Sequence, residues 1–492
     1  MALAAILACS TQAQNEHLIG KWEEPPGGYD WPLSAVHAAH LHTGKVLVWK
    51  HGSSAKLWNP ASGDFTDVPT GLPIHCSGHV SLADGSILAA GGQEGGAVDR
   101  TAIFNLLNVG IPGPWQEVAD MNFVRWYPTC TTLPDGRVLA VAGSDAIAGG
   151  CRQCIPEIYD PVTDTWEALA VETLDIARWY PFMFVAPDGR VFFAGGSAGC
   201  GGGGCDCQPQ QSECGQDSYM LDVELETWTE FPPPPNNDSF FTGAQGSAVM
   251  YEPGKVLKSG GNSGGVQGIN STAVIDLNDV SPQWELADEM IFPRRLHNLV
   301  LLPDGKILAV GGKNDLGTVK EAEWFDPDPL DPQWEELAEM TIARSTHSTA
   351  VLLPDATVLA AGGPESAEIF RPPYLFEPGG EAPRPLIGFA PTAVHHGTNF
   401  SIILSSGSPV PPEAIAKVSF VRLAALTHNF DQNQRYVPLV FQTDPSSLYS
   451  LIVQAPPNGN LAPPGYYMLF LISDDGVPSV AKYVQLTLAA SI

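Results

Sequence analysis

An eleven-residue pattern recurs six times along the chain. In each copy an apolar run enters a turn that usually contains Asp-Gly, and a second apolar run then leads to a small-Gly pair, as in LPDGRVLAVAG at 133–143. The pairs end at Gly92, Gly143, Gly196, Gly261, Gly312 and Gly363. A degenerate earlier copy, LHTGKVLVWKHG, lies at 41–52. Two apolar runs joined by such a turn predict a β-hairpin, so we expect a series of seven hairpins.

The residues after each small-Gly pair complete a four-stranded unit. A variable loop leads to an outer strand such as PEIYDP, and a tryptophan usually follows: Trp115, Trp166, Trp228, Trp284 and Trp334. Repeats of about 50 residues with these features are typical of Kelch blades, and seven copies predict a seven-bladed β-propeller. The seventh copy lacks its tryptophan strand, whereas GKWEEPP at 20–26 has one without a blade. We expect this N-terminal strand to complete the seventh blade, because an open stack of sheets would expose its edges.

The repeat stops at EPGGEAPRP, residues 377–385, which has the composition of a linker. Beyond it, short β-runs such as NFSIILSS and YYMLFLIS alternate with Pro, Gly and Asn, which indicates an immunoglobulin-like (early set) sandwich. The predicted fold is all-β: a leader at 1–19, a seven-bladed Kelch-type propeller at 20–380 and a C-terminal β-sandwich at 385–492.

Net charge and the N-terminus bear on location and partners. The 492 residues carry a formal charge of −30, which disfavours nucleic acid and anionic lipid as partners. The first residues, MALAAILACSTQAQ, are too short to span a membrane, and no later stretch has eighteen unbroken apolar residues. Ile6 to Cys9 resembles the end of a bacterial lipoprotein signal, with Cys9 as a possible lipid anchor; an ordinary frayed terminus is the alternative. We expect a secreted, periplasmic or cell-surface protein.

Six of the nine cysteines lie in two Gly-rich loops, GGCRQC and AGCGGGGCDCQPQQSEC. In an exported protein such clusters favour disulfides that hold the loops. A zinc site stays open as the alternative, because Cys151 and Cys154 have ligand spacing.

The repeat register brings chemically active side chains together. In this blade design the first strand lines the axis and starts at the end where the small-Gly pair finishes. Sixteen residues before the second Gly of each pair stand Cys76, Tyr127, Tyr180, Gln245, Leu296 and His347. The seventh blade has one extra residue between its arginine and its turn. Singly, a tyrosine, a histidine or a cysteine here would be channel lining or filler; together they suggest a redox or metal site at one mouth of the axis.

Several of these segments resemble, in order, the motifs of the copper radical oxidases, the family of galactose oxidase and glyoxal oxidase. They are HCSGHVSLADGSILAAGG, RWYPTCTTLPDGRVLAVAGS, RSTHSTAVLLPD with EIFRPPYLF, VRLAALTHNFDQNQRYVPL and GYYMLFLISDDGVPSVAKYVQL. The resemblance runs from about Trp22 to the end. It implies a copper ion held by Tyr127, His347 and His428, with His428 on a sandwich loop that reaches into the propeller. It also implies a thioether between Cys76 and Tyr127, with Tyr127 as the radical site. Such a centre oxidises an alcohol, aldehyde or carbohydrate with O2 and releases hydrogen peroxide.

Two positions depart from the family pattern. The family has a tyrosine just before the first histidine ligand, as axial ligand and base; here this residue is Thr346. A threonine hydroxyl is a poor acid and ligand, and losing a positioned base costs about 10²–10⁴-fold in rate. His297 is a possible stand-in, although a strand-end hydrogen bond is its alternative role. The tryptophan that shields the radical in galactose oxidase is also missing from its loop, and Trp126 or Trp179 could cover the site instead.

Three functions therefore remain open. The first is a copper-radical oxidase with altered axial chemistry. The second is a copper-binding relative with the thioether but feeble catalysis, acting in cell-surface or glycan binding. The third is a metal-free propeller that serves as an adhesion or scaffold module. The two histidines argue against the third, and Thr346 keeps the second open.

Overall fold

The computed structural model describes residues 15–51, 55–105, 114–145, 151, 153–171, 179–196, 218–231, 245–263, 266–327, 330 and 332–488. Most of the predicted leader, including Cys9, lies outside these ranges, as do the cysteines at 200, 205, 207 and 214. Among the described residues, none of the helices has the length and apolarity needed to cross a membrane.

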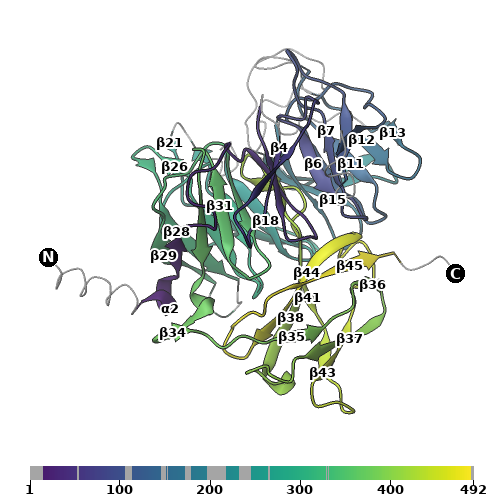
Figure 1. The fold of residues 1–492 in the computed structure, drawn as a ribbon. Coiled ribbons are helices and arrows are strands. Elements are labelled where there is room, and N and C mark those ends of the chain that lie inside the picture. Colours follow the sequence, from purple (N-terminus) through teal and green to yellow (C-terminus); the bar gives the residue numbers. More distant parts are fainter. Residues whose placement is uncertain are drawn as a thin grey trace.

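Sheets with the strand order of a Kelch blade dominate the structure (Figure 1). Seven are found in the described part of the chain: six have four antiparallel blade strands in chain order, and the last has three plus β1. The first three consist of β2 (His37–His40), β3 (Val46–Trp49), β4 (Ala55–Trp58) and β5 (Phe65–Val68); β6 (Gly78–Ser81), β7 (Ile87–Ala90), β8 (Thr101–Phe104) and β9 (Trp115–Glu117); and β10 (Thr129–Thr132), β11 (Val138–Val141), β12 (Glu157–Asp160) and β13 (Thr165–Ala168). The others consist of β14 (Pro181–Val185), β15 (Val191–Gly196), β16 (Ser218–Asp222) and β17 (Thr227–Phe231); β18 (Ser247–Glu252), β19 (Lys255–Ser259), β22 (Thr272–Asp276) and β23 (Glu285–Ala287); β24 (Asn298–Leu301), β25 (Ile307–Val310), β28 (Glu321–Asp326) and β29 (Gln333–Glu339); and β30 (Ser348–Leu352), β31 (Val358–Gly362), β32 (Ala367–Arg371) and β1 (Lys21–Glu23).

The seventh blade is completed by the N-terminal strand, as the sequence predicts. Strand β1 pairs antiparallel with β32, with Trp22 opposite Phe370. The Trp22 indole N–H donates to Ala338 O at 2.8 Å, and its ring centroid lies 4.9 Å from that of Phe370. This pairing covers the edge of β32, and it joins the N-terminal strand to the last blade of the ring in one sheet.

The C-terminal domain is a sandwich of two sheets. One contains β35 (Ile387–Phe389), β37 (Asn399–Leu404), β43 (Ser450–Gln454) and β42 (Phe441–Thr443). The other contains β36 (Ala393–His395), β45 (Lys482–Thr487), β44 (Gly465–Ser473), β38 (Ile415–Arg422) and β41 (Tyr436–Leu439). In β37 exposed and buried residues alternate, as expected for a strand with one face on the core.

The sandwich packs on the Asp-Gly end of the propeller (Figure 1). Gly85, in the hairpin turn of the second blade, has φ +84°, and a Cβ there would come within 2.9 Å of the Tyr466 ring. Glycine is needed at this turn both for its backbone conformation and for this approach. The opposite end of the propeller, where the small-Gly pairs finish, is therefore the end at which the inner strands begin.

One sandwich hairpin runs into the propeller axis. It consists of β39 (Ala425–Thr427) and β40 (Phe430–Asp431), and β39 pairs antiparallel with β2, so the first blade becomes a six-stranded sheet. Beyond it, Gln432 Oε1 accepts the backbone N–H groups of His79 (3.1 Å) and Cys130 (2.8 Å) from two different blades. The hairpin is thus fixed to the inner strands by backbone and side-chain hydrogen bonds.

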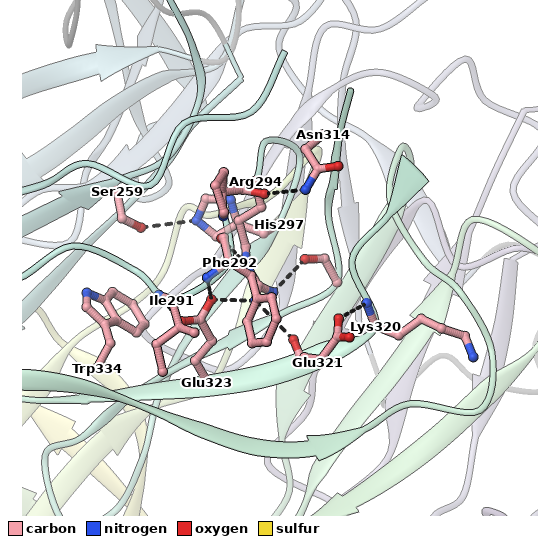
Figure 2. Close-up of polar contacts among 12 residues, drawn as sticks. Ser259, Ile291, Phe292, Arg294, His297, Asn314, Lys320, Glu321, Glu323 and Trp334 are labelled. Carbon is pink, nitrogen blue, oxygen red and sulfur yellow. Dashed lines mark hydrogen bonds and ion pairs between the residues drawn. The ribbon is translucent and has the colours of Figure 1, made fainter. Parts of the chain in front are cut away.

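In two blades a buried arginine just before the inner strand pairs with a glutamate of the third strand. In the sixth blade the fully buried Arg294 pairs with Glu323, and its guanidinium also donates to Gly311 O at 2.9 Å (Figure 2). Glu323 in turn accepts the backbone N–H of Ile291 at 2.7 Å. The third blade repeats the arrangement with Arg125 and Glu157, 2.9 Å apart. Each pair fixes the backbone two residues before the register position of its blade, which is Tyr127 in the third blade and Leu296 in the sixth.

We predict that Glu323→Gln lowers the free energy of unfolding by about 3–5 kcal/mol, because the buried charge of Arg294 then has no carboxylate to neutralise it. Asp67→Asn is the matched control: it breaks the Lys56–Asp67 pair of the first blade, whose carboxylate is exposed, and should cost less than about 1 kcal/mol. Thermal and urea unfolding of the two variants measure the difference; equal midpoints would show that the buried pair does not carry this role.

Candidate metal centre

The six positions predicted by the register share an unusual backbone conformation. All have positive φ: Cys76 62°, Tyr127 67°, Tyr180 43°, Gln245 78°, Leu296 56° and His347 61°. Positive φ is uncommon for residues other than glycine, so its recurrence confirms that the positions are equivalent, including the one in the seventh blade. Backbone hydrogen bonds join neighbours: Tyr127 N–H donates to Cys76 O at 3.0 Å, and Tyr180 N–H donates to Tyr127 O at 3.0 Å.

His428 reaches this mouth from the sandwich hairpin. The two-residue loop between β39 and β40 is His428-Asn429, and both residues have positive φ, 49° and 63°. This is the requirement of a type I′ turn, which most often has Asn-Gly. The Asn429 side chain donates to Gly246 O at 2.7 Å, and Ser247 Oγ donates to Asn429 O at 2.8 Å. The tip of the hairpin is therefore held by the fifth blade.

Tyr127, His347 and His428 come together at the axis. His428 Nε2 lies 3.2 Å from Tyr127 Oη, and the two ring centroids are 4.6 Å apart. The His347 and His428 rings are 4.8 Å apart and nearly perpendicular. Burial lowers the pKa of His347 and, with neighbouring histidines, lowers that of His428 well below its usual value. Both imidazoles are therefore neutral at pH 7, the form that binds a metal.

The hydrogen bonds of His428 fix its tautomer. Its Nδ1 lies 2.6 Å from Thr427 Oγ1, and that hydroxyl donates to Val36 O at 2.9 Å. Because the hydroxyl has one hydrogen, it accepts from Nδ1–H, and Nε2 keeps its lone pair. In metal-bound histidines the ring nitrogen that does not bind the metal usually has such a hydrogen-bond partner, which fixes the orientation of the ring.

Cys76 and Tyr127 are side by side. The two side chains are close enough for each to affect the pKa of the other, and Cys76 is buried and forms no disulfide. Burial raises the pKa of the Cys76 thiol to about 12. Burial and the neighbouring Cys76 raise the pKa of Tyr127. Cys130, the other described cysteine outside a disulfide, is fully buried, with its sulfur close to Gly78.

Trp126 and Trp179 both cover Tyr127. The Trp126 ring is stacked on the Tyr127 ring, with centroids 4.1 Å apart and an interplanar angle of 18°. Trp179 meets Tyr127 edge-on at 5.8 Å and Trp126 at 5.2 Å. The stacked ring is thus supplied by Trp126, the residue before Tyr127 in the chain.

Thr346 and His297 lie in different surroundings. Thr346 is exposed, next to His347 at the axial mouth. His297 is fully buried between the fifth and sixth blades, and its Nε2 is 3.1 Å from Ser259 Oγ (Figure 2). The structure therefore gives His297 the strand-end hydrogen bond, to Ser259, and does not bring it to Tyr127.

Two neighbours of the cluster carry no predicted role. Tyr180 is fully buried, stacks on His428 at 4.8 Å and donates its hydroxyl hydrogen to Ser77 O at 3.2 Å. His37 stacks on Trp49 at 4.8 Å, and its Nε2 accepts the Cys76 N–H at 3.0 Å. Tyr180 is one of the six positions that the repeat register predicts. His37 belongs to the degenerate first blade, where the pattern gives no such signal.

The donor set fits copper. Two neutral imidazoles and a phenol oxygen, with the Nε2 of His428 and the Oη of Tyr127 directed toward each other, suit Cu(II), which prefers nitrogen and oxygen ligands in a tetragonal arrangement. In the described part of the chain, no three His, Cys, Asp or Glu side chains cluster as a metal site, so such a centre depends on the tyrosine. Cys151 and Cys154 are both disulfide-bonded, which excludes the zinc alternative for this pair.

Two family signatures match this chain. Residues 384–486 match the galactose oxidase-like early set domain. Residues 125–170, from Arg125 through the third blade, match the Kelch motif. The first match lies in the sandwich and the second in the propeller.

Relatives and a solved structure extend the similarity to most of the chain. Aldehyde oxidase GLOX of Vitis pseudoreticulata is 30% identical over 84% of this chain and 81% of its own length. Galactose oxidase of Gibberella zeae is 28% identical over 95% of this chain and 71% of its own length. A fungal alcohol oxidase in complex with copper is similar in structure, with a TM-score of 0.80 at 26% identity, over 96% of this chain and all of that one. These similarities, with a fold and a ring of converging side chains that agree with them, show that the chain belongs to the copper radical oxidases, the family of galactose oxidase and glyoxal oxidase.

Proposed function

We propose that this protein is a copper-dependent oxidase that converts a primary alcohol or an aldehyde, with O2, into the next oxidation product and hydrogen peroxide. The observation that supports it most is the contact of Tyr127 with both Cys76 and His428, with His347 beside them. For an alcohol the balance is RCH2OH + O2 → RCHO + H2O2, a two-electron oxidation. A hydrated aldehyde, RCH(OH)2, gives the acid in the same way.

Copper would be held by Tyr127, His347 and His428, and when bound it would supply one-electron redox chemistry. The oxidised Tyr127 would accept the second electron of the substrate. A thioether from Cys76 to the Tyr127 ring, formed with loss of two hydrogens, makes the ring easier to oxidise. The Trp126 ring, stacked at 4.1 Å, keeps water from one face of Tyr127. The oxidised Tyr127 takes the hydrogen atom from the substrate carbon.

Thr346 weakens this chemistry. In the family, the residue at this position accepts the proton of the substrate hydroxyl. A threonine hydroxyl is too weakly acidic to be deprotonated near neutral pH, so it offers no basic form to accept that proton. Its side chain is also much shorter than that of tyrosine. We propose that turnover is slow for this reason.

A second function is supported by the same residue. Without a base at position 346, the protein would bind copper and form the thioether but catalyse poorly, and act in cell-surface or glycan binding. For either function we propose an exported protein. Disulfides at Cys151 and Cys154 favour an oxidising compartment.

The thioether gives the first prediction. After incubation with copper and O2, the protein should lose the mass of two hydrogens beyond those lost in disulfides, and peptide mapping should place the loss on a cross-linked pair with Cys76 and Tyr127. Cys76→Ser should abolish the loss, whereas Cys130→Ser, at the other buried thiol, should keep it. An uncross-linked Cys76 peptide from copper-treated protein would contradict the proposal.

The second prediction concerns position 346. Thr346→Tyr should raise peroxide release on glyoxal, methylglyoxal or a primary alcohol, by about 10²–10⁴-fold if the hydroxyl reaches the position of a working base. Thr346→Phe is the control, since it adds the ring without the hydroxyl and should give no gain. If Thr346→Tyr binds copper normally and turns over no faster than the unchanged protein, the missing base is not the limitation.

A further inference from the structure

We propose that the pocket between the first and second blades binds the substrate, and that His75 positions it by a hydrogen bond to a substrate hydroxyl. The reaction of the bound substrate rests on the proposed oxidase function, whereas its binding in the pocket does not. The pocket would take an uncharged, hydroxyl-bearing molecule such as an alcohol or a hydrated aldehyde.

The pocket opens at the same mouth as the metal ligands. It has a volume of about 430 Å³ and is lined by residues 49–51, 70–75 and 93–95. These segments follow β3, precede β6 and follow β7, at the end where the small-Gly pairs finish. The volume is within the about 300–1,000 Å³ typical of small-molecule sites. A second pocket of about 430 Å³ is lined in part by Asp135, Asp188 and Asn460. It lies at the Asp-Gly end, opposite the end that carries His347 and His428.

His75 connects the pocket with the metal centre. It precedes Cys76 as Thr346 precedes His347, so the two residues hold equivalent places in their blades. The His37 ring is close to both, with its centroid 5.7 Å from that of His75 and 6.0 Å from that of His428. His75 is also near enough to His347 for their charges to interact. A substrate that contacts His75 would therefore extend toward His347 and His428.

The His75 ring has hydrogen-bonding capacity that the protein does not use. Among the described residues, its Nδ1 is buried and has no hydrogen-bond partner. A buried polar nitrogen left unpaired is costly, and in native proteins it usually meets water or a ligand. The exposed ring of His51, on the pocket rim, lies 5.1 Å from that of His75. Two imidazoles at this separation can bind neighbouring hydroxyl groups of one molecule.

The charges of the lining favour a neutral ligand. Lys50 is paired with Glu365 of the seventh blade, so its charge is balanced. Glu94 is the remaining charged residue of the lining, and it is an acid on a protein with a formal charge of −30. A carboxylate-bearing substrate would be repelled here.

The test compares copper-loaded His75→Phe, His75→Gln and His42→Phe with the unchanged protein. His42→Phe is the control, because His42 stacks on Tyr466 at 4.2 Å at the sandwich end. Methylglyoxal and glyoxylate are titrated anaerobically, with the copper(II) signal in electron paramagnetic resonance as the readout. Kinetics with methylglyoxal then separate KM from kcat.

We expect His75→Phe to weaken methylglyoxal binding and raise KM tenfold or more, with kcat changed less than threefold and copper content unchanged. His75→Gln should stay within about threefold of the unchanged protein, and glyoxylate should bind more weakly than methylglyoxal. Equal binding by His75→Phe and the unchanged protein, or loss of copper from His75→Phe, would overturn the inference. Binding of methylglyoxal that depends on His75, without peroxide release, would support the inference and contradict the oxidase function.

Discussion

The candidate site depends on the insertion of one sandwich hairpin into the propeller axis. Strand β39 joins the first blade by backbone pairing, and the I′ turn then places His428 against Tyr127. Asn429 donates a hydrogen bond to the fifth blade, and Gln432 accepts hydrogen bonds from the second and third blades, so the tip is held on several sides. A two-residue turn has little freedom once its strands are paired, so domain packing sets the position of the imidazole. The two domains therefore form one functional unit.

The ring of positive-φ residues shows how a repeat fold can carry a specific site. Each such residue outside glycine is strained by about 1–3 kcal/mol. Gln245 and Leu296 share the conformation without a proposed metal role, so the strain belongs to the blade design and does not by itself mark function. In the proposed function, the residue types at three of the positions supply the chemistry. Hydrogen bonds between neighbouring positions, and the buried arginine–glutamate pairs of the third and sixth blades, help to offset this strain.

Most of the fold could be predicted from the sequence, because each hairpin, Gly-Gly pair and tryptophan is a local signal repeated many times. The pairing of β1 with β32 and the equivalence of His347 with Cys76 and Tyr127 followed from counting alone. Other features could not be predicted in this way. His428 was identified by resemblance, since nothing local shows that a sandwich turn reaches the axis. His297 has suitable chemistry but lies in an interface between blades, where it bonds Ser259. His37 and the pocket beside His75 depend on how adjacent blades pack, which no single repeat encodes.

The most direct test of the account is the position of copper in crystals of the copper-loaded protein, found by anomalous diffraction at the copper edge. The account predicts one strong peak at the axial mouth, within bonding distance of Tyr127 Oη and of one ring nitrogen each of His347 and His428. A peak at another group, such as His51 and His75, with none beside Tyr127, would contradict it.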